Sequence, residues 1–339
     1  MKEYIQKVSE KQNLTRNEAA SAMRIIMDNQ ATDVQIAGFL MALKVKGEDP
    51  DELLGFAEVM REKSIKVDID DPDAIDMCGT GGDGSGTFNI STVASFVVAG
   101  AGVTVAKHGN RAMSSSCGSA DVLKALGVNL EIPPEKAEAC INTVGIGFLF
   151  APLFHPAIKY AAKARSELGV KTCFNLLGPM TNPAGVRRQL VGTFNHDAAQ
   201  KMAEVFTRLN AIKVLLVHSH DGLDEVSLSA PTTVYDVNSQ LFSGKYNVDA
   251  KAFGLTIVTK DALRGGLAET NASIALKVLQ GEKGPHRDVV IVNAAFGLLV
   301  AGKVRTVQEG VSIAAESIDS GKALKKLSDL KAFTTHEYT

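Results

Sequence analysis

The spacing of apolar and polar residues divides the chain into a helical first part and a mixed second part. Within residues 1–70, Thr15, Thr32 and Asp49 each stand three residues before Glu or Gln, a pattern typical of helix starts. Apolar residues with helical spacing follow each of them, over 19–27, 36–45 and 53–61. We therefore predict a small all-helical domain over residues 1–70, with a linker at 68–72 that leads into the second part.

From residue 74 onward, short β-like runs alternate with helical runs. The β-like runs are 75–78, 103–106, 148–150, 190–191, 214–218 and 233–237, and the helical runs include 134–144, 156–168, 196–209, 287–302 and 307–320. This alternation predicts βαβ units, so we expect residues 74–339 to form a large α/β domain with a mostly parallel central sheet flanked by helices. Part of 165–185 is expected to pack on the helical domain. Ligands of such sheets bind at the carboxyl ends of strands, so a site is expected after Cys78, Ala106 and His218.

Composition narrows the class of protein without identifying it. The 339 residues are 45% apolar and 22% charged, which is ordinary for a globular chain of more than one domain. The net charge of −2 and the absence of a Lys/Arg run disfavour nucleic acid as a partner. None of the four cysteines forms a CxxC pair, so neither a zinc site nor a disulfide framework is indicated. No signal region or membrane-length apolar run is apparent, so we expect a cytoplasmic protein without a membrane partner.

A glycine-rich segment carries the strongest chemical signal. Five glycines occur within residues 79–86, between a predicted strand and the predicted helix 93–101. Such a loop exposes backbone N–H groups at a helix N-terminus, which is a typical phosphate-binding arrangement. Gly79, Gly81 and Gly84 also match the dinucleotide pattern, but Asp83 would repel a bare pyrophosphate and no acidic residue stands near position 100. No Lys-Ser/Thr pair closes the loop, which excludes a Walker A motif.

Two further segments add groups that suit a phosphorylated sugar and a metal ion. Residues 107–121 follow the predicted strand 103–106 and offer two cations, an imidazole, an amide and four serines. Asp224 and Glu225 follow the strand 214–218 and have the oxygen chemistry that Mg²⁺ prefers. The alternative interpretations are a solvated basic turn and an acidic surface turn. Arg165 is predicted at a helix end, and residues 175–183 are predicted to form a rigid, turn-rich connection between domains.

The segments 79–92, 107–121, 165–183 and 222–225 together resemble those of the anthranilate phosphoribosyltransferase family. The resemblance covers nearly the whole chain. It implies a head-to-head homodimer formed through the helical domains. It also implies transfer of the phosphoribosyl group from 5-phosphoribosyl 1-pyrophosphate to the amine of anthranilate, with release of pyrophosphate, in tryptophan biosynthesis.

The resemblance also implies roles for individual residues. Phosphoribosyl pyrophosphate would contact Gly79, Gly82, Asp83, Thr87, Asn89, Ile90, Ser91, Thr92, Lys107, His108, Gly109, Asn110, Arg111, Ala112, Met113, Ser114, Ser115 and Ser119. Anthranilate would contact Gly79, His108, Asn110 and Arg165, and Mg²⁺, two ions per subunit, would be held by Ser91, Asp224 and Glu225. His108, Lys107 and Arg165 would act in catalysis, with Arg165 meeting the anthranilate carboxylate and His108 as a candidate for proton transfer.

Three other functions remain as alternatives. A pyrimidine-nucleoside phosphorylase has a comparable Lys-His-Gly loop, but it would use free phosphate and would not need the acidic pair Asp224–Glu225. A non-catalytic nucleic-acid-binding member of the same fold would need a basic groove, which the net charge disfavours. A nicotinamide dehydrogenase has only the glycine pattern in its favour.

Overall fold

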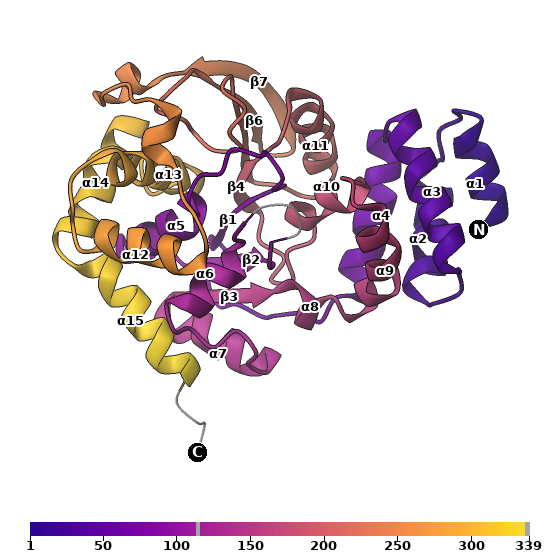
Figure 1. Ribbon diagram of the computed structural model, residues 1–339, viewed down its shortest axis with the longest axis horizontal. Helices are drawn as coiled ribbons and strands as arrows, with labels where there is room; N and C mark the ends of the chain where they lie inside the picture. The colour runs from indigo at the N-terminus through magenta and orange to yellow at the C-terminus, as the bar shows by residue number, and fades with distance from the viewer. Residues whose placement is uncertain (113–115, 336–339) are drawn as a thin grey trace.

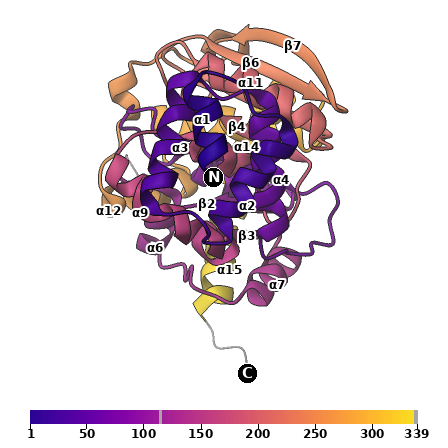
Figure 2. The same ribbon diagram turned by 90° about the vertical axis from the view of Figure 1, so that its right-hand side faces the viewer.

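The computed structural model describes residues 1–112 and 116–335. Four helices form a bundle at the N-terminal end, to the right in Figure 1, and the bundle stands in front of the sheet in Figure 2. These helices are α1 (Lys2–Ser9), α2 (Arg16–Met27), α3 (Asp33–Lys46) and α4 (Pro50–Lys63). Thr15, Thr32 and Asp49 are N-caps with complete capping boxes, as the sequence pattern predicts. Helices α9 (Lys159–Leu168) and α10 (Cys173–Met180) from the second part of the chain pack against this bundle.

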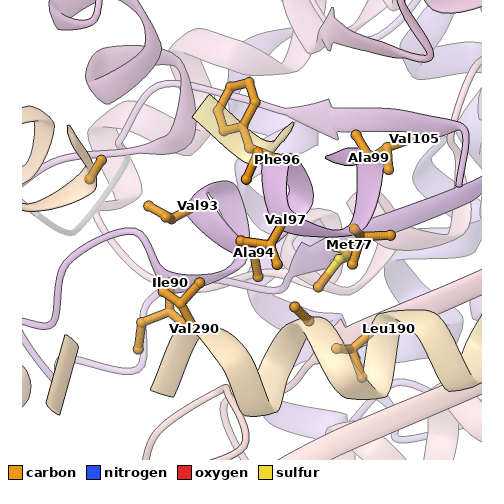
Figure 3. Close-up of a cluster of buried hydrophobic side chains, with 14 of the residues drawn as sticks. Met77, Ile90, Val93, Ala94, Phe96, Val97, Ala99, Val105, Leu190 and Val290 are labelled. Atoms are coloured by element: carbon orange, nitrogen blue, oxygen red, sulfur yellow. The ribbon is translucent and has the colours of Figure 1, made fainter. Parts of the chain in front are cut away.

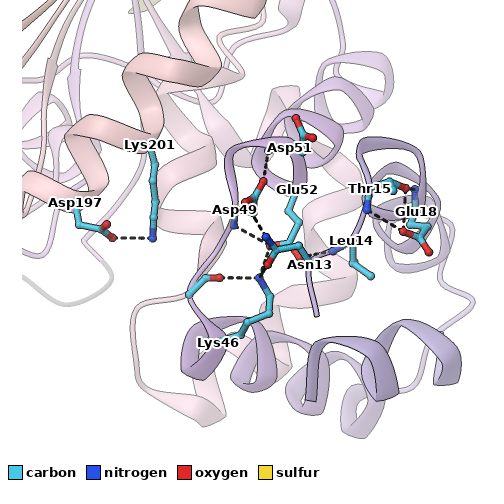
Figure 4. A network of polar contacts seen from close by, with 11 residues as sticks. Asn13, Leu14, Thr15, Glu18, Lys46, Asp49, Asp51, Glu52, Asp197 and Lys201 are labelled. Carbon is cyan, nitrogen blue, oxygen red and sulfur yellow. Dashed lines mark hydrogen bonds and ion pairs between the residues drawn. The ribbon is translucent and has the colours of Figure 1, made fainter. Parts of the chain in front are cut away.

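A buried ion pair stabilises the turn between α3 and α4 (Figure 4). The side chains of Lys46 and Glu52 are 4% and 0% exposed, and their charged atoms lie 2.9 Å apart. Glu52 also accepts hydrogen bonds from the backbone N–H groups of Leu14 and Asp49, each at 2.8 Å. These bonds compensate the cost of burying the carboxylate, so the pair joins three segments of the bundle.

A seven-stranded sheet forms the centre of the larger part, with the strand order β3-β2-β1-β4-β5-β6-β7. Neighbouring strands from β3 to β5 pair in parallel, whereas β6 pairs antiparallel with both β5 and β7. This confirms the prediction of a mostly parallel sheet. The strands are β1 (Ile75–Gly79), β2 (Val105–Gly109), β3 (Ile146–Phe150), β4 (Arg188–Gly192), β5 (Lys213–Ser219), β6 (Thr232–Asn238) and β7 (Leu241–Val248). Because β2 and β4 lie on opposite sides of β1, the strand order reverses at β1, where such sheets bind ligands.

The two faces of the sheet belong to different hydrophobic cores. Leu190 and Leu215 point into a core with α5 (Ile90–Gly100) and α13 (Pro285–Val300), part of which is shown in Figure 3. Their neighbours Val191 and Val214 point into a second core with α11 (His196–Arg208), α10 and the helical bundle. The alternation follows from the two-residue period of a strand. The face of the sheet that carries Val191 and Val214 therefore shares its core with the helical bundle.

The remaining helices complete the layers around the sheet. They are α6 (Ser119–Ala125), α7 (Pro134–Val144), α8 (Ala151–Phe154), α12 (Ala268–Leu279), α14 (Val307–Asp319) and α15 (Lys322–Thr335), with 3₁₀ turns at Pro156–Ile158, Ala250–Phe253 and Lys260–Leu263. Helices α14 and α15 pack against α5 on the face away from the bundle. Within residues 1–112 and 116–335, no helix has both the length and the apolarity needed to cross a membrane.

Two segments have a different secondary structure from the one predicted. Strand β2 begins at Val105 and includes Lys107, His108 and Gly109, which the sequence pattern places in the following loop. Polar residues do not normally indicate a buried strand, but here Lys107 and His108 are buried with specific partners. Residues 173–180 form helix α10 with Pro179 inside its last turn, whereas the turn-rich composition of 175–183 predicts a rigid connection between domains.

Candidate active site

A cavity of about 310 Å³ lies where the helical bundle meets the carboxyl ends of β1 and β2. Its lining includes every site residue expected from the sequence that the structure describes: Gly79, Gly82, Asp83, Thr87, Asn89, Ile90, Ser91, Thr92, Lys107, His108, Gly109, Asn110, Arg111, Ala112, Ser119, Arg165, Asp224 and Glu225. Met113, Ser114 and Ser115 lie outside the described residues. Met60, His155, Phe174 and Gly178 also line the cavity, so its wall comes from both parts of the chain.

The glycine-rich loop forms one side of this cavity. Gly81, Gly82, Gly84 and Gly86 have φ between 65° and 71°, a backbone conformation that other residues rarely adopt. The loop leads into α5, whose first residues, Ile90, Ser91 and Thr92, line the cavity. The N–H of Ser91 donates to Glu225 Oε1 at 3.0 Å, so the start of this helix is joined to the acidic pair.

Three carboxylates gather beside the glycine loop at the point where the strand order reverses. Burial raises the pKa of Asp224 to about 7, and the nearby Asp83 carboxylate adds to this shift. Burial and Asp224 likewise raise the pKa of Glu225 to about 8, which Lys107 partly offsets. Among the described residues, Asp83 Oδ2 is buried without a hydrogen-bond partner. The raised pKa values mean that the ionised forms of Asp224 and Glu225 have too little compensation from the protein alone.

This arrangement fits a hydrated divalent cation. In the described residues, no three or more His, Cys, Asp or Glu side chains form a group that could hold a metal ion by themselves. Mg²⁺ requires no such group, because it keeps several waters and takes one or two carboxylates together with substrate phosphates. Asp224, Glu225 and Ser91, which are linked through the Ser91 amide, offer oxygen ligands of this kind.

Lys107 lies in strand β2 and not in the loop that follows it. Its side chain is buried within β2, and Nζ donates to the carbonyl oxygen of Met77 on the adjacent strand. Its charge partly offsets the rise that burial causes in the pKa of Asp76 and of Glu225. The ammonium group thus compensates the carboxylates from behind while the residue still lines the cavity.

The two ring nitrogens of His108 differ in their contacts. Nδ1 lies 3.2 Å from the carbonyl oxygen of Gly178, so Nδ1 carries the proton and Nε2 is left as an acceptor. Nε2 is buried and has no hydrogen-bond partner among the described residues, and the centre of the His155 ring lies 5.1 Å from that of His108. Burial, together with the neighbouring His155, lowers the pKa of His108 to about 3. The imidazole is therefore neutral at pH 7 and can accept a hydrogen bond.

Arg165 supplies a cation on the opposite wall. Its guanidinium lies 4.7 Å from the centre of the Phe174 ring, and burial lowers its pKa. Among the described residues, Arg165 has no ion pair within 4.0 Å. A cation and an aromatic face in the same wall suit an aromatic carboxylate as a ligand.

Asp76 and Asn182 hold this wall to the sheet. The carboxylate of Asp76 accepts the N–H of His108 at 3.2 Å and the side-chain amide of Asn182 at 2.9 Å. Asn182 also donates to the carbonyl oxygen of Ala106 at 2.9 Å. Sequence reasoning missed the roles of Asp76, Asn182 and His155. The one available signal was a charged residue, Asp76, inside an otherwise apolar predicted strand.

Comparison with known proteins gives consistent results over the whole chain. The model of the glycosyl transferase family helical bundle domain matches residues 2–64, and that of the glycosyl transferase family a/b domain matches residues 71–324. The chain is 50% identical over 334 residues to the anthranilate phosphoribosyltransferase of Symbiobacterium thermophilum, covering 98% of both chains. The corresponding protein of Moorella thermoacetica is also 50% identical, over 333 residues and 98% of both chains.

Solved structures agree with these matches. The crystal structure of anthranilate phosphoribosyltransferase from Thermus thermophilus superposes with a TM-score of 0.93 at 42% identity, covering 98% of this chain and 99% of that one. The Saccharomyces cerevisiae enzyme in complex with PRPP and Mg gives a TM-score of 0.91 at 27% identity, covering 98% and 97% of the two chains.

Proposed function

The chain belongs to the glycosyl transferase family that combines a helical bundle domain with an a/b domain, and we propose that it catalyses phosphoribosyl transfer to anthranilate. The donor is 5-phosphoribosyl 1-pyrophosphate, and the products are N-(5-phosphoribosyl)anthranilate and pyrophosphate, in tryptophan biosynthesis. One observation supports this most strongly. A single cavity joins a phosphate-binding loop with three carboxylates to a wall that carries a neutral imidazole and a cation.

The glycine loop and the acidic group would bind the donor. The loop amides and the N-terminus of α5 would bind phosphate oxygens, and Asn110, Arg111, Ser116 and Ser119, which also line the cavity, would supply side-chain donors. Asp224, Glu225 and Ser91 would hold Mg²⁺, and two ions per subunit remain part of the proposal. When bound, Mg²⁺ neutralises charge that develops on the departing pyrophosphate. Lys107 supports this charge balance from beneath the loop.

The wall formed by α9, α10 and β2 would bind the acceptor. Arg165 would meet the anthranilate carboxylate with a charge-assisted hydrogen bond, while Phe174 lies beside it. The aromatic amine is neutral at pH 7, so it can attack the ribose without prior deprotonation. His108 Nε2 is an acceptor with no hydrogen-bond partner in 1–112 and 116–335, and it would take a hydrogen bond from the amine as the amine proton becomes acidic.

Catalysis would then rest mainly on positioning and electrostatic stabilisation. Both substrates are held in one cavity between the two parts of the chain, which converts their encounter into a reaction within one complex. A homodimer formed through the bundles also belongs to the proposal. Val34 and Val45, which are 81% and 73% exposed on α3, support an apolar contact there. The cytoplasmic location stays a prediction.

The decay of anthranilate fluorescence tests the function. We expect the purified protein to consume anthranilate only when phosphoribosyl pyrophosphate and Mg²⁺ are both present, and EDTA to stop the decay. A phosphorylase would instead cleave thymidine in the presence of phosphate, without a metal. Thymidine cleavage together with stable anthranilate fluorescence would overturn the proposal.

A further inference from the structure

Asn271 lies outside the cavity but is bonded to the loop that forms it. It stands in the first turn of α12 and is 2% exposed. Its Oδ1 accepts the backbone N–H of Gly266 at 2.7 Å. Its Nδ2 donates to Asn89 Oδ1 at 3.1 Å, across 182 residues of sequence. The side-chain amide of Asn271 thus connects the C-terminal part of the chain to the end of the glycine loop.

Asn89 extends this connection to residues 116–119, the serine-rich segment that precedes α6. Its Nδ2 donates to the carbonyl oxygen of Cys117 at 3.1 Å, and the thiol of Cys117 donates to its Oδ1 at 3.4 Å. Ser116 Oγ donates to the carbonyl oxygen of Gly266 at 3.2 Å. A closed set of hydrogen bonds therefore joins 264–271, the glycine loop and the serine-rich segment. The side-chain amide of Asn89 therefore joins Cys117 to Asn271.

The backbone beside Asn271 leaves little freedom for this set of bonds to shift. The N–H of Gly265 donates to the carbonyl oxygen of Gly86 at 2.9 Å, and Arg264 forms a β-bridge with Thr87. A Cβ added to Gly265 would lie 2.6 Å from both Asn271 Oδ1 and the backbone nitrogen of Phe88. Close backbone contact thus fixes the acceptor oxygen of Asn271.

The packing of helix α12 also connects the glycine loop with the serine-rich segment. Helix α12 contacts both α5 and α6. Helix α5 begins where the glycine loop ends, and α6 begins at Ser119, where the serine-rich segment ends (Figure 1). The N-termini of two helices that face the cavity are therefore held by one neighbouring helix, and Asn271 is the polar contact at its start.

We propose that Asn271 is a positioning residue for the phosphoribosyl pyrophosphate site. It keeps the two loops that contact the donor at the correct separation, acting through Asn89 and Gly266. This inference rests on the proposed function for the identity of the donor. The acceptor wall is held by a separate set of bonds, those of Asp76 with His108 and Asn182. Loss of Asn271 is therefore expected to affect the donor and to leave the acceptor alone.

The test compares Asn271→Asp, Asn271→Ala and the control Ser273→Ala, on the exposed side of the same helix. Asn271→Asp keeps the size and the acceptor for Gly266 but has no donor for Asn89. We expect both Asn271 variants to raise the KM for phosphoribosyl pyrophosphate by about tenfold, less than the roughly 100-fold cost of a full 1 Å misplacement, because the backbone hydrogen bond of Gly265 to Gly86 remains. The KM for anthranilate and the behaviour of Ser273→Ala are expected to stay unchanged.

A change in the KM for phosphoribosyl pyrophosphate without a change in the KM for anthranilate distinguishes a positioning role from an effect on protein stability. A purely structural role would lower the melting temperature and the active fraction without changing either KM. Should Asn271→Ala fail to fold, Asn271→Asp alone decides the question. Equal changes in both KM values, or a wild-type donor KM in a folded Asn271→Asp variant, would overturn the inference. Calorimetric binding of phosphoribosyl pyrophosphate to the wild type with Mg²⁺ shows separately whether the proposed donor is correct.

Discussion

Two glycines at the ends of adjacent strands allow Asp224 to approach the sheet. Gly79 ends β1 and Gly192 ends β4, and the two are partners in the strand register. A Cβ on Gly192 would lie 1.7 Å from the carbonyl oxygen of Asp224 and 2.7 Å from its carbonyl carbon. A Cβ on Gly79 would lie 2.9 Å from Asp224 Oδ2, which is the end of a side chain. An added Cβ would therefore displace the backbone of Asp224 at Gly192, but only its carboxylate at Gly79.

We predict that Gly192→Ala displaces the backbone of Asp224 by more than about 1 Å, because contacts of that length do not persist in packed proteins. A displacement of this size costs about 100-fold in activity when it affects a group that positions substrate. Gly79→Ala requires only rotation of a carboxylate and is expected to cost about tenfold. Gly38→Ala on the exposed side of α3, where an added Cβ meets nothing within 4 Å, is the control.

The assay is kcat/KM for phosphoribosyl pyrophosphate, measured by anthranilate fluorescence over a range of Mg²⁺ concentrations. The apparent KM for Mg²⁺ is expected to rise in Gly192→Ala and to stay constant in Gly38→Ala. Circular dichroism melts show whether each variant is folded at the assay temperature. A folded Gly192→Ala variant with wild-type kcat/KM would refute the steric reasoning and the placement of Asp224 at the metal site.

Three other outcomes follow from the geometry. Arg165→Ala is expected to raise the KM for anthranilate about tenfold with little change in the donor KM, and an unchanged anthranilate KM would remove Arg165 from the acceptor site. Because the pKa values of Asp224 and Glu225 are raised, the metal-free protein binds extra protons and loses stability as pH rises from about 4 to about 8. Mg²⁺ is therefore expected to bind more tightly and to raise the melting temperature more at about pH 9 than at about pH 6; titration calorimetry that shows no pH dependence would contradict this. Glu52→Ala leaves Lys46 buried without its partner and is expected to lower the free energy of unfolding by about 3–5 kcal/mol, measured by urea denaturation.

The sequence predicts the elements that have regular patterns. The capping boxes at Thr15 and Thr32 place α2 and α3 correctly, because a helix start depends on interactions within a few residues. The helix at 134–144 is found with the same bounds. Strands β1 and β5 lie where their apolar runs indicate, since buried parallel strands are continuously apolar.

Elements that depend on distant partners could not be predicted in this way. Lys107 and His108 belong to a strand only because Met77, Asp76 and Gly178 satisfy their polar atoms. No local pattern reveals those partners. The helix at 173–180 forms on the surface of the bundle in spite of its turn-forming composition.

The candidate site likewise contains residues that a local pattern reveals and residues that depend on distant partners. The glycine loop and the acidic pair are contiguous motifs, so their chemistry can be recognised in the sequence. His155 and Asn271 are single residues whose meaning depends on a neighbour 47 or 182 positions away. A single histidine or asparagine at such a position carries no signal until the fold brings its partner beside it.

In the proposed function, phosphoribosyl transfer in the cavity depends on a metal ion held by the acidic pair. The decisive experiment measures pyrophosphate release together with anthranilate consumption, in the wild type and in Asp224→Asn. We expect one pyrophosphate for each anthranilate, full dependence on Mg²⁺, and a loss of about 100-fold or more in the variant. Pyrophosphate release without anthranilate consumption, or a folded Asp224→Asn variant with wild-type turnover, would contradict it.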